Sequence, residues 1–306
     1  MNPLLLLPLL FNAHGSVPED EPKEPAEETA GSGKEISPEA QPSPMGAVPL
    51  SVVEAAHTSH QLTLAHRMKA VSEPMLDAPY VTDPLGEGEG IDADPPARYD
   101  VFDCLTFVEE VMALSLAGDP VHSAQIRQSL RYGELPPTYT NRHHFMELQW
   151  IPQNLAANWL RDTTDEYGET IEFSRKVTLA LWRNWGRRSL FAHSDDQLPV
   201  GEMSLKVLPL DQAREIVDQI PPGSLIFTVR DDRPWIPLWI THVGFTIPAE
   251  EPTIRHASRM KSSMRVRDHS LKWYLDHLAT YVNWKTAGIT IMEPVEPGPR
   301  VSLLPH

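Results

Sequence analysis

The chain is poor in cysteine and in positive charge. Its 306 residues include one cysteine, Cys104. A single cysteine excludes a disulfide within the chain, so cysteine usage does not reveal the redox compartment. Lys and Arg number 26 against 42 Asp and Glu, and the formal net charge is -16. Nucleic acids and anionic membrane surfaces attract clustered cations, so this balance argues against both as partners.

Long apolar runs are also missing. The apolar run at the N-terminus, from Leu4 to Phe11, is too short to span a bilayer, and we expect no stable membrane insertion. Small residues follow this run at Ala13 and Gly15, where signal cleavage would fall. The pattern predicts a signal peptide over residues 1–15 and a periplasmic or extracellular location.

Large apolar side chains are almost absent from residues 16–48, which are rich in Pro, Glu, Ser and Ala. Such a segment cannot bury enough surface to offset the entropy of ordering it. We predict a disordered, acidic, Pro-rich linker over residues 16–48 and one folded domain over residues 49–306. The sequence contains no internal repeat, and we expect a monomer.

The spacing of apolar residues within the folded domain changes along the chain. It predicts helices at Ser51–Met68, Val121–Tyr132, Phe145–Leu190 and Leu210–Ile220, with a loop over Met75–Pro96. After Pro221 the period becomes two, which predicts strands at Ser224–Val229, Trp239–Ile247, Thr253–Ser258, Met264–Arg267 and Ala287–Met292, with a helix over Ser270–Ala279. Helices followed by a mostly antiparallel sheet are typical of an α+β domain.

The single cysteine stands where a helix is predicted to begin. Asp103 is a good N-cap residue, which places Cys104 in the first helical turn. Backbone N–H groups there lack partners and lie at the positive end of the helix dipole. These surroundings favour a thiolate, the reactive form. Cys104 is therefore a candidate nucleophile, and the alternative is a small buried core residue.

Two histidines fall on neighbouring predicted strands. A hairpin closed by residues 248–252 and paired symmetrically about Ala249 places His242 directly opposite His256. Opposed side chains lie about 4.5–5.5 Å apart at Cβ, so the two imidazoles can hydrogen-bond. We predict that His242 takes the thiol proton and that His256 orients it, as in covalent acyl transfer. Gly244 would leave space for a substrate backbone.

These motifs resemble those of a known family. The segments 102–109 (Phe-Asp-Cys-Leu-Thr-Phe-Val-Glu), 241–245 (Thr-His-Val-Gly-Phe) and 256–258 (His-Ala-Ser) resemble the NlpC-type papain-like cysteine hydrolases of bacterial cell walls. The branch of N-acetylmuramoyl-L-alanine amidase-like proteins is the most similar, because residues 142–145 followed by Trp150 resemble its Arg-x-His-aromatic motif. The similarity covers about residues 55 to 295. Gly223-Ser224 departs from the Gly-Asp of that branch, so a role of that Asp is not carried over.

The resemblance implies a papain-like (NlpC-type) α+β fold with N-terminal helices packed on the sheet. It implies a cysteine amidase domain with Cys104, His242 and His256 as its triad, without metal or other cofactor. The substrate would be peptidoglycan or a muropeptide, and the resemblance favours cleavage of the bond between the lactyl group of N-acetylmuramic acid and L-alanine. The backbone N–H of Cys104 is the simplest oxyanion donor.

Three alternatives stay open. A stem-peptide endopeptidase of the same fold would cut a bond further along the peptide. A zinc amidase would use His143, His144, His242 or His256, although no His-Glu-x-x-His motif is present. A non-catalytic cell-wall-binding module on the same scaffold is the third.

Further residues are candidates for substrate binding. His144 is the rival for the third triad position, or it lines the substrate cleft with Arg142. A guanidinium can bind a peptide carboxylate bidentately, and the alternative for Arg142 is a surface ion pair. Tyr99 would add an oxyanion donor or merely pack. Trp239, together with Trp235, would form a wall of the cleft.

Overall fold

The structure, a computed structural model, describes residues 48–298. The signal peptide predicted over residues 1–15 and the linker predicted over residues 16–48, apart from Val48, lie outside the described residues. Among the helices of the described part, none has the length and apolar character needed to cross a bilayer.

Helices form the first part of the described chain. They are α1 (Leu50–Ser59), α2 (Leu64–Ser72), α3 (Cys104–Ala117), α4 (Pro120–Tyr132) and α5 (Ile151–Ala156), with a π-helix at Met146–Trp150 directly before α5. The helix predicted over Ser51–Met68 is two helices. The chain turns after His60, and Thr63 has an extended backbone (ψ 156°) as the N-cap of α2.

An eight-stranded antiparallel sheet completes the described residues. Its strands are β1 (Leu160–Asp162), β2 (Ile171–Val177), β3 (Gly201–Pro209), β4 (Leu225–Arg230), β5 (Ile240–Ile247), β6 (Thr253–Ser258), β7 (Arg265–Ser270) and β8 (Thr286–Pro294). The spatial order is β2-β3-β8-β4-β5-β6-β7, and β1 pairs with β8. Three helices lie between strands in the sequence: α6 (Leu179–Asn184), α7 (Leu210–Glu215) and α8 (Leu271–Leu278). The predicted α+β class and antiparallel sheet are confirmed.

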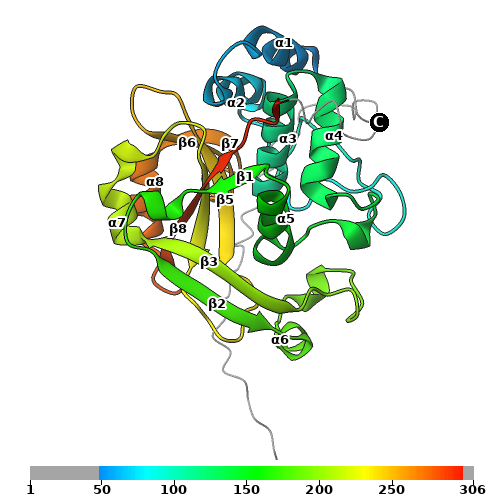
Figure 1. The fold of residues 1–306 in the computed structure, drawn as a ribbon, viewed down its shortest axis with the longest axis vertical. Helices are drawn as coiled ribbons and strands as arrows, with labels where there is room; N and C mark the ends of the chain where they lie inside the picture. Colours follow the sequence, from blue (N-terminus) through cyan, green and yellow to red (C-terminus); the bar gives the residue numbers. More distant parts are fainter. Residues whose placement is uncertain (1–47, 299–306) are drawn as a thin grey trace, which may run out of the picture. The chain divides into compact units, whose positions relative to one another are not determined.

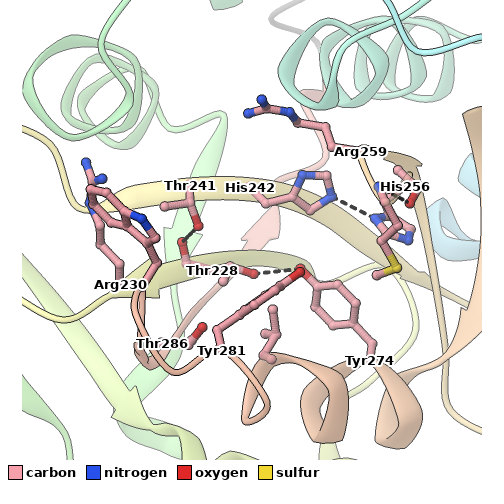
Figure 2. A pocket seen from close by; sticks show the side chains of 13 residues that line it. Thr228, Arg230, Thr241, His242, His256, Arg259, Tyr274, Tyr281 and Thr286 are labelled. Carbon is pink, nitrogen blue, oxygen red and sulfur yellow. Dashed lines mark hydrogen bonds between the residues drawn. The ribbon is translucent and has the colours of Figure 1, made fainter. Parts of the chain in front are cut away.

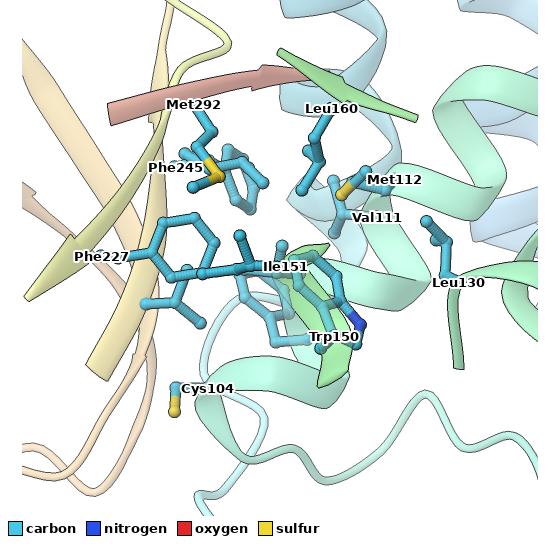
Figure 3. Close-up of a cluster of buried hydrophobic side chains, with 14 of the residues drawn as sticks. Cys104, Val111, Met112, Leu130, Trp150, Ile151, Leu160, Phe227, Phe245 and Met292 are labelled. Carbon is cyan, nitrogen blue, oxygen red and sulfur yellow. The ribbon is translucent and has the colours of Figure 1, made fainter. Parts of the chain in front are cut away.

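Helices cover both faces of this sheet (Figure 1). Alternate residues of β4 point to opposite faces, so Phe227 joins the buried cluster of α3, whereas Ile226 joins the cluster of α7 and α8. Figure 3 shows Phe227, Phe245 and Trp150 within the first cluster, with Cys104 at its margin. The start of α3 is therefore held against the sheet by the packing of the helix behind it.

The helical region predicted over Phe145–Leu190 is wrong for much of its length. It contains β1 and β2 as well as the short helices α5 and α6. Strand β2 pairs with β3 from Ile171 opposite Val207 to Val177 opposite Gly201. Most β2 side chains are exposed or half-buried, so the strand depends on its partner rather than on a strong apolar pattern of its own.

Candidate active site

The start of α3 is built as the sequence predicts. Cys104 is the first helical residue, and Asp103 is its N-cap. The Thr106 N–H donates to Asp103 Oδ1 at 2.8 Å, and the Asp103 N–H donates to Thr106 Oγ1 at 3.0 Å. This reciprocal pair is a capping box, which fixes where the helix begins and hence where the cysteine stands.

The thiol of Cys104 is a neutral group, contrary to the expected thiolate. Burial, reinforced by the neighbouring Asp103 charge, raises the pKa of Cys104 to about 12. The N–H groups of Val243 and Leu105 and the Arg259 charge act in the opposite direction but do not compensate. Loss of hydration thus outweighs the favourable position at the helix start.

The sulfur lies beside the strand that carries His242. The Thr246 N–H donates to the carbonyl oxygen of Ser224, directly before β4. The N–H of Val243, an odd number of residues away along β5, therefore points to the β6 side. The recorded β5–β6 pairing ends at Phe245, before it reaches Val243. The Val243 N–H is instead a hydrogen-bond partner of the Cys104 sulfur, one residue along the chain from His242.

His242 and His256 are hydrogen-bonded, although their register differs from the prediction. The recorded pairs are Ile247 with Thr253, Thr246 with Ile254, and Phe245 with Arg255. The loop is therefore centred on Glu250 rather than Ala249, and His242 lies diagonal to His256. A shift of two residues leaves side chains on the same face. His242 Nε2 and His256 Nδ1 lie 2.7 Å apart (Figure 2).

Gly244 makes room for His256 rather than for a substrate backbone. A Cβ atom on Gly244 would lie 2.8 Å from the Cβ of His256 and 3.0 Å from the carbonyl oxygen of Arg255. Real Cβ contacts are not that short. On the α8 side, the ring of Tyr274 lies edge-on to His256, with 5.3 Å between centroids. His256 is thus enclosed from both directions.

A third histidine continues the chain of imidazoles. His256 Nε2 lies 2.8 Å from Nδ1 of His269 on β7, a contact that the sequence analysis missed. Burial is the main reason that the pKa of His242 falls to about 3 and that of His256 lies well below the usual range. Both rings are therefore neutral at pH 7.

Two residues near the thiol were not predicted. The hydroxyl of Tyr80 hydrogen-bonds to Cys104, and the guanidinium carbon of Arg259 lies 5.7 Å from the centre of the Tyr80 ring. A backbone bridge from Tyr80 to Phe102 carries the tyrosine to the helix start, and no sequence spacing signals that bridge. Arg259 directly follows the 256–258 motif, which is the signal that could have found it.

A cavity of about 340 Å³ adjoins the histidine pair. Its lining includes His242, His256, Arg259, Tyr274, Tyr281 and Trp284. Figure 2 shows the first five of these around the cavity. Cys104 is not among the residues that line this cavity. Aromatic rings and polar groups around such a space are suited to holding part of an organic ligand next to the imidazoles.

Arg142 is bound within the protein. Its guanidinium donates to Leu85 O at 2.6 Å and to Glu87 at 3.2 Å, and it pairs with Asp92 and Asp83. Only 11% of its side chain is exposed. The carboxylates that it binds belong to the loop at residues 83–92, so its visible role is to hold that loop.

His144 does not contact the histidine pair. Its Nε2 bonds to the carbonyl oxygen of Tyr139 at 2.8 Å, and its ring packs among aromatic side chains that include His193. Burial lowers the pKa of His144 to about 3. Of the two rivals for the third position, His256 is the residue hydrogen-bonded to His242.

Tyr99 and Trp239 also lie elsewhere than expected. The Tyr99 hydroxyl is hydrogen-bonded to Glu110 and Arg127 rather than to Cys104. Trp239 is 1% exposed, and its Nε1–H donates to Asp232 at 2.7 Å. The prediction that Trp239 forms a cleft wall is wrong, because the ring is part of the core.

The histidines that a zinc amidase would use as ligands do not lie around a common metal position in the described residues. Within residues 48–298, no group of three or more His, Cys, Asp or Glu side chains has the arrangement to hold a metal ion. His242 and His256 bond in a line with His269, and His143 and His144 lie in the other part of the fold.

The comparisons with known proteins place the chain in a class of amide hydrolases. The family model described as N-acetylmuramoyl-L-alanine amidase-like (AmiA-like) matches residues 70–281, more than half of the chain. The chain belongs to this family. Membership indicates a hydrolase of amide bonds with peptidoglycan as its substrate class. The predicted amidase-like branch is confirmed at this level, and the comparison with curated proteins finds no match.

Two solved structures share the fold. A Legionella pneumophila protein of the family DUF1460 is 24% identical, with a TM-score of 0.68 over 80% of this chain and 93% of that one. An N-acetylmuramoyl-L-alanine amidase from Bacteroides uniformis is 21% identical, with a TM-score of 0.56 over 79% of this chain and 98% of that one. At these identities the likeness concerns the fold alone.

Proposed function

We propose that the protein is a cysteine-dependent amidase that cuts the bond between the lactyl group of N-acetylmuramic acid and L-alanine in peptidoglycan or muropeptides. In this proposal the scaffold is of the papain-like, NlpC type, and Cys104, His242 and His256 form the triad. The observation that carries the proposal is the 2.7 Å hydrogen bond between the two imidazoles next to the strand position that binds the Cys104 sulfur.

The resting pair in this mechanism is a neutral thiol and a neutral imidazole. Burial raises the pKa of Cys104 and lowers the pKa of His242, so a standing thiolate–imidazolium pair is disfavoured. Proton transfer to His242 therefore accompanies the attack of sulfur on the amide carbonyl. His242 then gives the proton to the leaving amine, and water attacking the thioester releases the acyl group and restores the thiol.

Two donors are available to the tetrahedral oxyanion. One is the Cys104 N–H, at the helix start where N–H groups have no intrahelical partner. The other is the Tyr80 hydroxyl, which already contacts the sulfur. Tyr80 thus takes the role that the sequence offered to Tyr99. Donors fixed before the reaction contribute most because they need no reorganisation.

Arg259 takes the role that the sequence offered to Arg142. Its guanidinium is exposed, and its charge acts on both Cys104 and His242. A guanidinium in that position can bind a carboxylate of the peptide part of the substrate. A substrate of the cell wall agrees with a periplasmic or extracellular location, and the signal peptide over residues 1–15 remains a prediction.

The test is mass spectrometry of defined muropeptides after incubation with the native protein and with Cys104→Ala. Free stem peptide plus the amino sugar, seen only with the native protein, is the expected result. A shortened stem would instead identify an endopeptidase. Binding without turnover by the native protein would identify a wall-binding module, and turnover by Cys104→Ala would remove the nucleophile from the proposal.

The histidines provide a matched pair of variants for the base. His242 and His144 both have a pKa that burial lowers to about 3, and neither residue is exposed. We expect His242→Ala to lose turnover by about a hundredfold or more, as for a general base. His144→Ala should keep its turnover number on folded protein, while its stability falls. Equal losses in the two variants would assign both effects to folding.

A further inference from the structure

His269 stands at the end of a hydrogen-bonded line of imidazoles that begins at the candidate base. His242 Nε2 is 2.7 Å from His256 Nδ1, and His256 Nε2 is 2.8 Å from His269 Nδ1. We propose that His269 is a positioning residue, which accepts a hydrogen bond from His256 and thereby fixes the tautomers of His256 and His242. This inference rests on the proposed function and extends its site by one residue.

Only one arrangement of protons lets His242 act on the thiol. Nδ1 of His242 must be unprotonated to accept the proton, so its hydrogen is on Nε2. That hydrogen is donated to His256 Nδ1, which leaves the hydrogen of His256 on Nε2. The His256 Nε2–H then needs an acceptor, and His269 Nδ1 is the atom it faces. Each ring thus fixes the tautomer of the one before it.

In this site the hydrogen-bonded imidazoles of His256 and His269 stand where a charged carboxylate could otherwise orient the base. His256 is neutral, because burial together with the His242 and His269 rings lowers its pKa. A neutral acceptor stabilises the imidazolium of His242 only through its lone pair. Donation from His256 to His269 raises the electron density at His256 Nδ1, because hydrogen bonds in a chain polarise one another. Without His269, His256 would hold a buried donor without a partner.

The position of His269 is itself fixed by its neighbours. Its ring stacks on Trp273, with centroids 4.5 Å apart and planes 24° apart. Trp273 lies in the first turn of α8, where its N–H bonds to the Ser270 hydroxyl that caps the helix. The acceptor nitrogen is therefore set by β7 and α8 together, rather than by a free side chain.

Charged groups around the line act on its protonation. Burial is the main cause of the lowered pKa of His256 and of His269, and the Arg267 charge lowers both further. His277 of α8 lowers the pKa of His269 further, while Asp268 opposes this shift. At the His242 end of the row of imidazoles, the Arg259 charge adds to burial in lowering the pKa of His242. Burial is the main reason that the imidazoles are neutral, and the neighbouring Arg charges add to it. Neutral rings can pass hydrogen bonds in one direction.

Three variants test the proposal. His269→Leu removes the acceptor, whereas His269→Asn keeps an amide oxygen near the place of Nδ1. His277→Leu removes a neighbouring imidazole that stacks on Trp273 but does not bond to His256. We expect His269→Leu to lower kcat about tenfold with KM nearly unchanged, the cost of one buried hydrogen bond to a group that becomes charged. The Asn variant should restore most of kcat, and His277→Leu should keep it.

Two further measurements do not require substrate turnover. Nitrogen-15 spectra of labelled histidine should show His256 protonated at Nε2 in the native protein and should show that signal altered in His269→Leu. The rate of Cys104 alkylation by iodoacetamide at pH 7 should fall in the same variant and recover in His269→Asn. These readouts remain valid if the native protein cuts no muropeptide, so failure of the proposed function can be told from failure of the histidine line.

Specific results would overturn the role of His269. One such result is a His269→Leu variant whose kcat and rate of Cys104 alkylation both equal those of the native protein. Equal losses in His269→Leu and His269→Asn would show that the ring matters for folding rather than as an acceptor. A native spectrum with the His256 proton on Nδ1 would reverse the direction of the line and end the proposal.

Discussion

At the residue scale, His256 can occupy its position because Gly244 has no side chain. Continuing the recorded β5–β6 register sets Gly244 opposite His256, and a Cβ there would meet both the side chain and the neighbouring backbone. His256 in turn holds Nε2 of His242. A methyl group added at residue 244 therefore acts on His242 through one intermediate, His256.

We predict that Gly244→Ala lowers kcat by about tenfold to a hundredfold, because small displacements of catalytic groups have effects of this size. Overpacking should also lower the free energy of unfolding by about 1–3 kcal/mol. Gly90→Ala is the control, since its φ of +74° strains the backbone but nothing lies within 4 Å. Kinetics and urea unfolding of both variants check this. A native kcat in Gly244→Ala would contradict it.

Single residues were predictable where their partners are near in sequence. Cys104 follows its own N-cap, and His242 and His256 belong to one hairpin. Arg142 was misread because its carboxylate partners, Glu87 and Asp92, come from a loop some fifty residues earlier. Their pairing depends on how the loop folds back, which no local spacing encodes.

At the element scale, the start of α3 combines a cap with a charge next to the thiol. Asp103 accepts from the Thr106 N–H at 2.8 Å, and its carboxylate raises the pKa of Cys104. These two effects can be separated. Asparagine is as good an N-cap as aspartate but carries no charge, whereas alanine lacks both properties.

We predict that Asp103→Asn speeds alkylation of Cys104 at pH 8 by about threefold to tenfold, since removal of a nearby negative charge lowers the thiol pKa. Its stability should stay near native. Asp103→Ala should also speed alkylation but should lose about 1 kcal/mol of stability with the cap. Iodoacetamide kinetics and urea unfolding measure the two effects. Slower alkylation in the Asn variant would refute the role of the charge.

Elements were predictable where the apolar pattern was strong. Strands β4 and β5 are mostly apolar, and the predicted bounds of β4, β5 and β6 are within a residue or two of the observed ones. Strand β2 has few buried side chains and was read as helix, since only its pairing with β3 makes it a strand. The hairpin register missed by two residues because the loop centre, Glu250, is not marked by a turn residue such as glycine.

At the scale of the whole molecule, the described residues include several histidines that are shielded from water. His144, His193 and His256 are largely shielded from water, and burial is the main cause of the lowered pKa of each. They lie in two separate regions, one around Tyr139 and one at the sheet face of α8. Folding therefore requires several imidazoles to be neutral at once.

This arrangement predicts loss of stability in mild acid. An unfolded histidine has a pKa of about 6.5, whereas the pKa values of His242 and His144 are about 3 in the folded state. Below pH 6.5 the unfolded state binds more protons, so the free energy of unfolding falls as pH falls toward 3. Each such histidine contributes up to about 1.4 kcal/mol for each pH unit. Asp83 acts in the opposite direction, because burial raises its pKa to about 6.

Urea unfolding between pH 7 and pH 5 tests this prediction. We expect a fall of several kcal/mol in the native protein, because more than one buried histidine contributes at about 1.4 kcal/mol per pH unit. His144→Phe keeps a ring among the aromatic neighbours, so its slope should be smaller by about one histidine's share. If the free energy of unfolding of His144→Phe changed with pH as it does in the native protein, the imidazole of His144 would be protonated in the folded state. That outcome would contradict the burial argument.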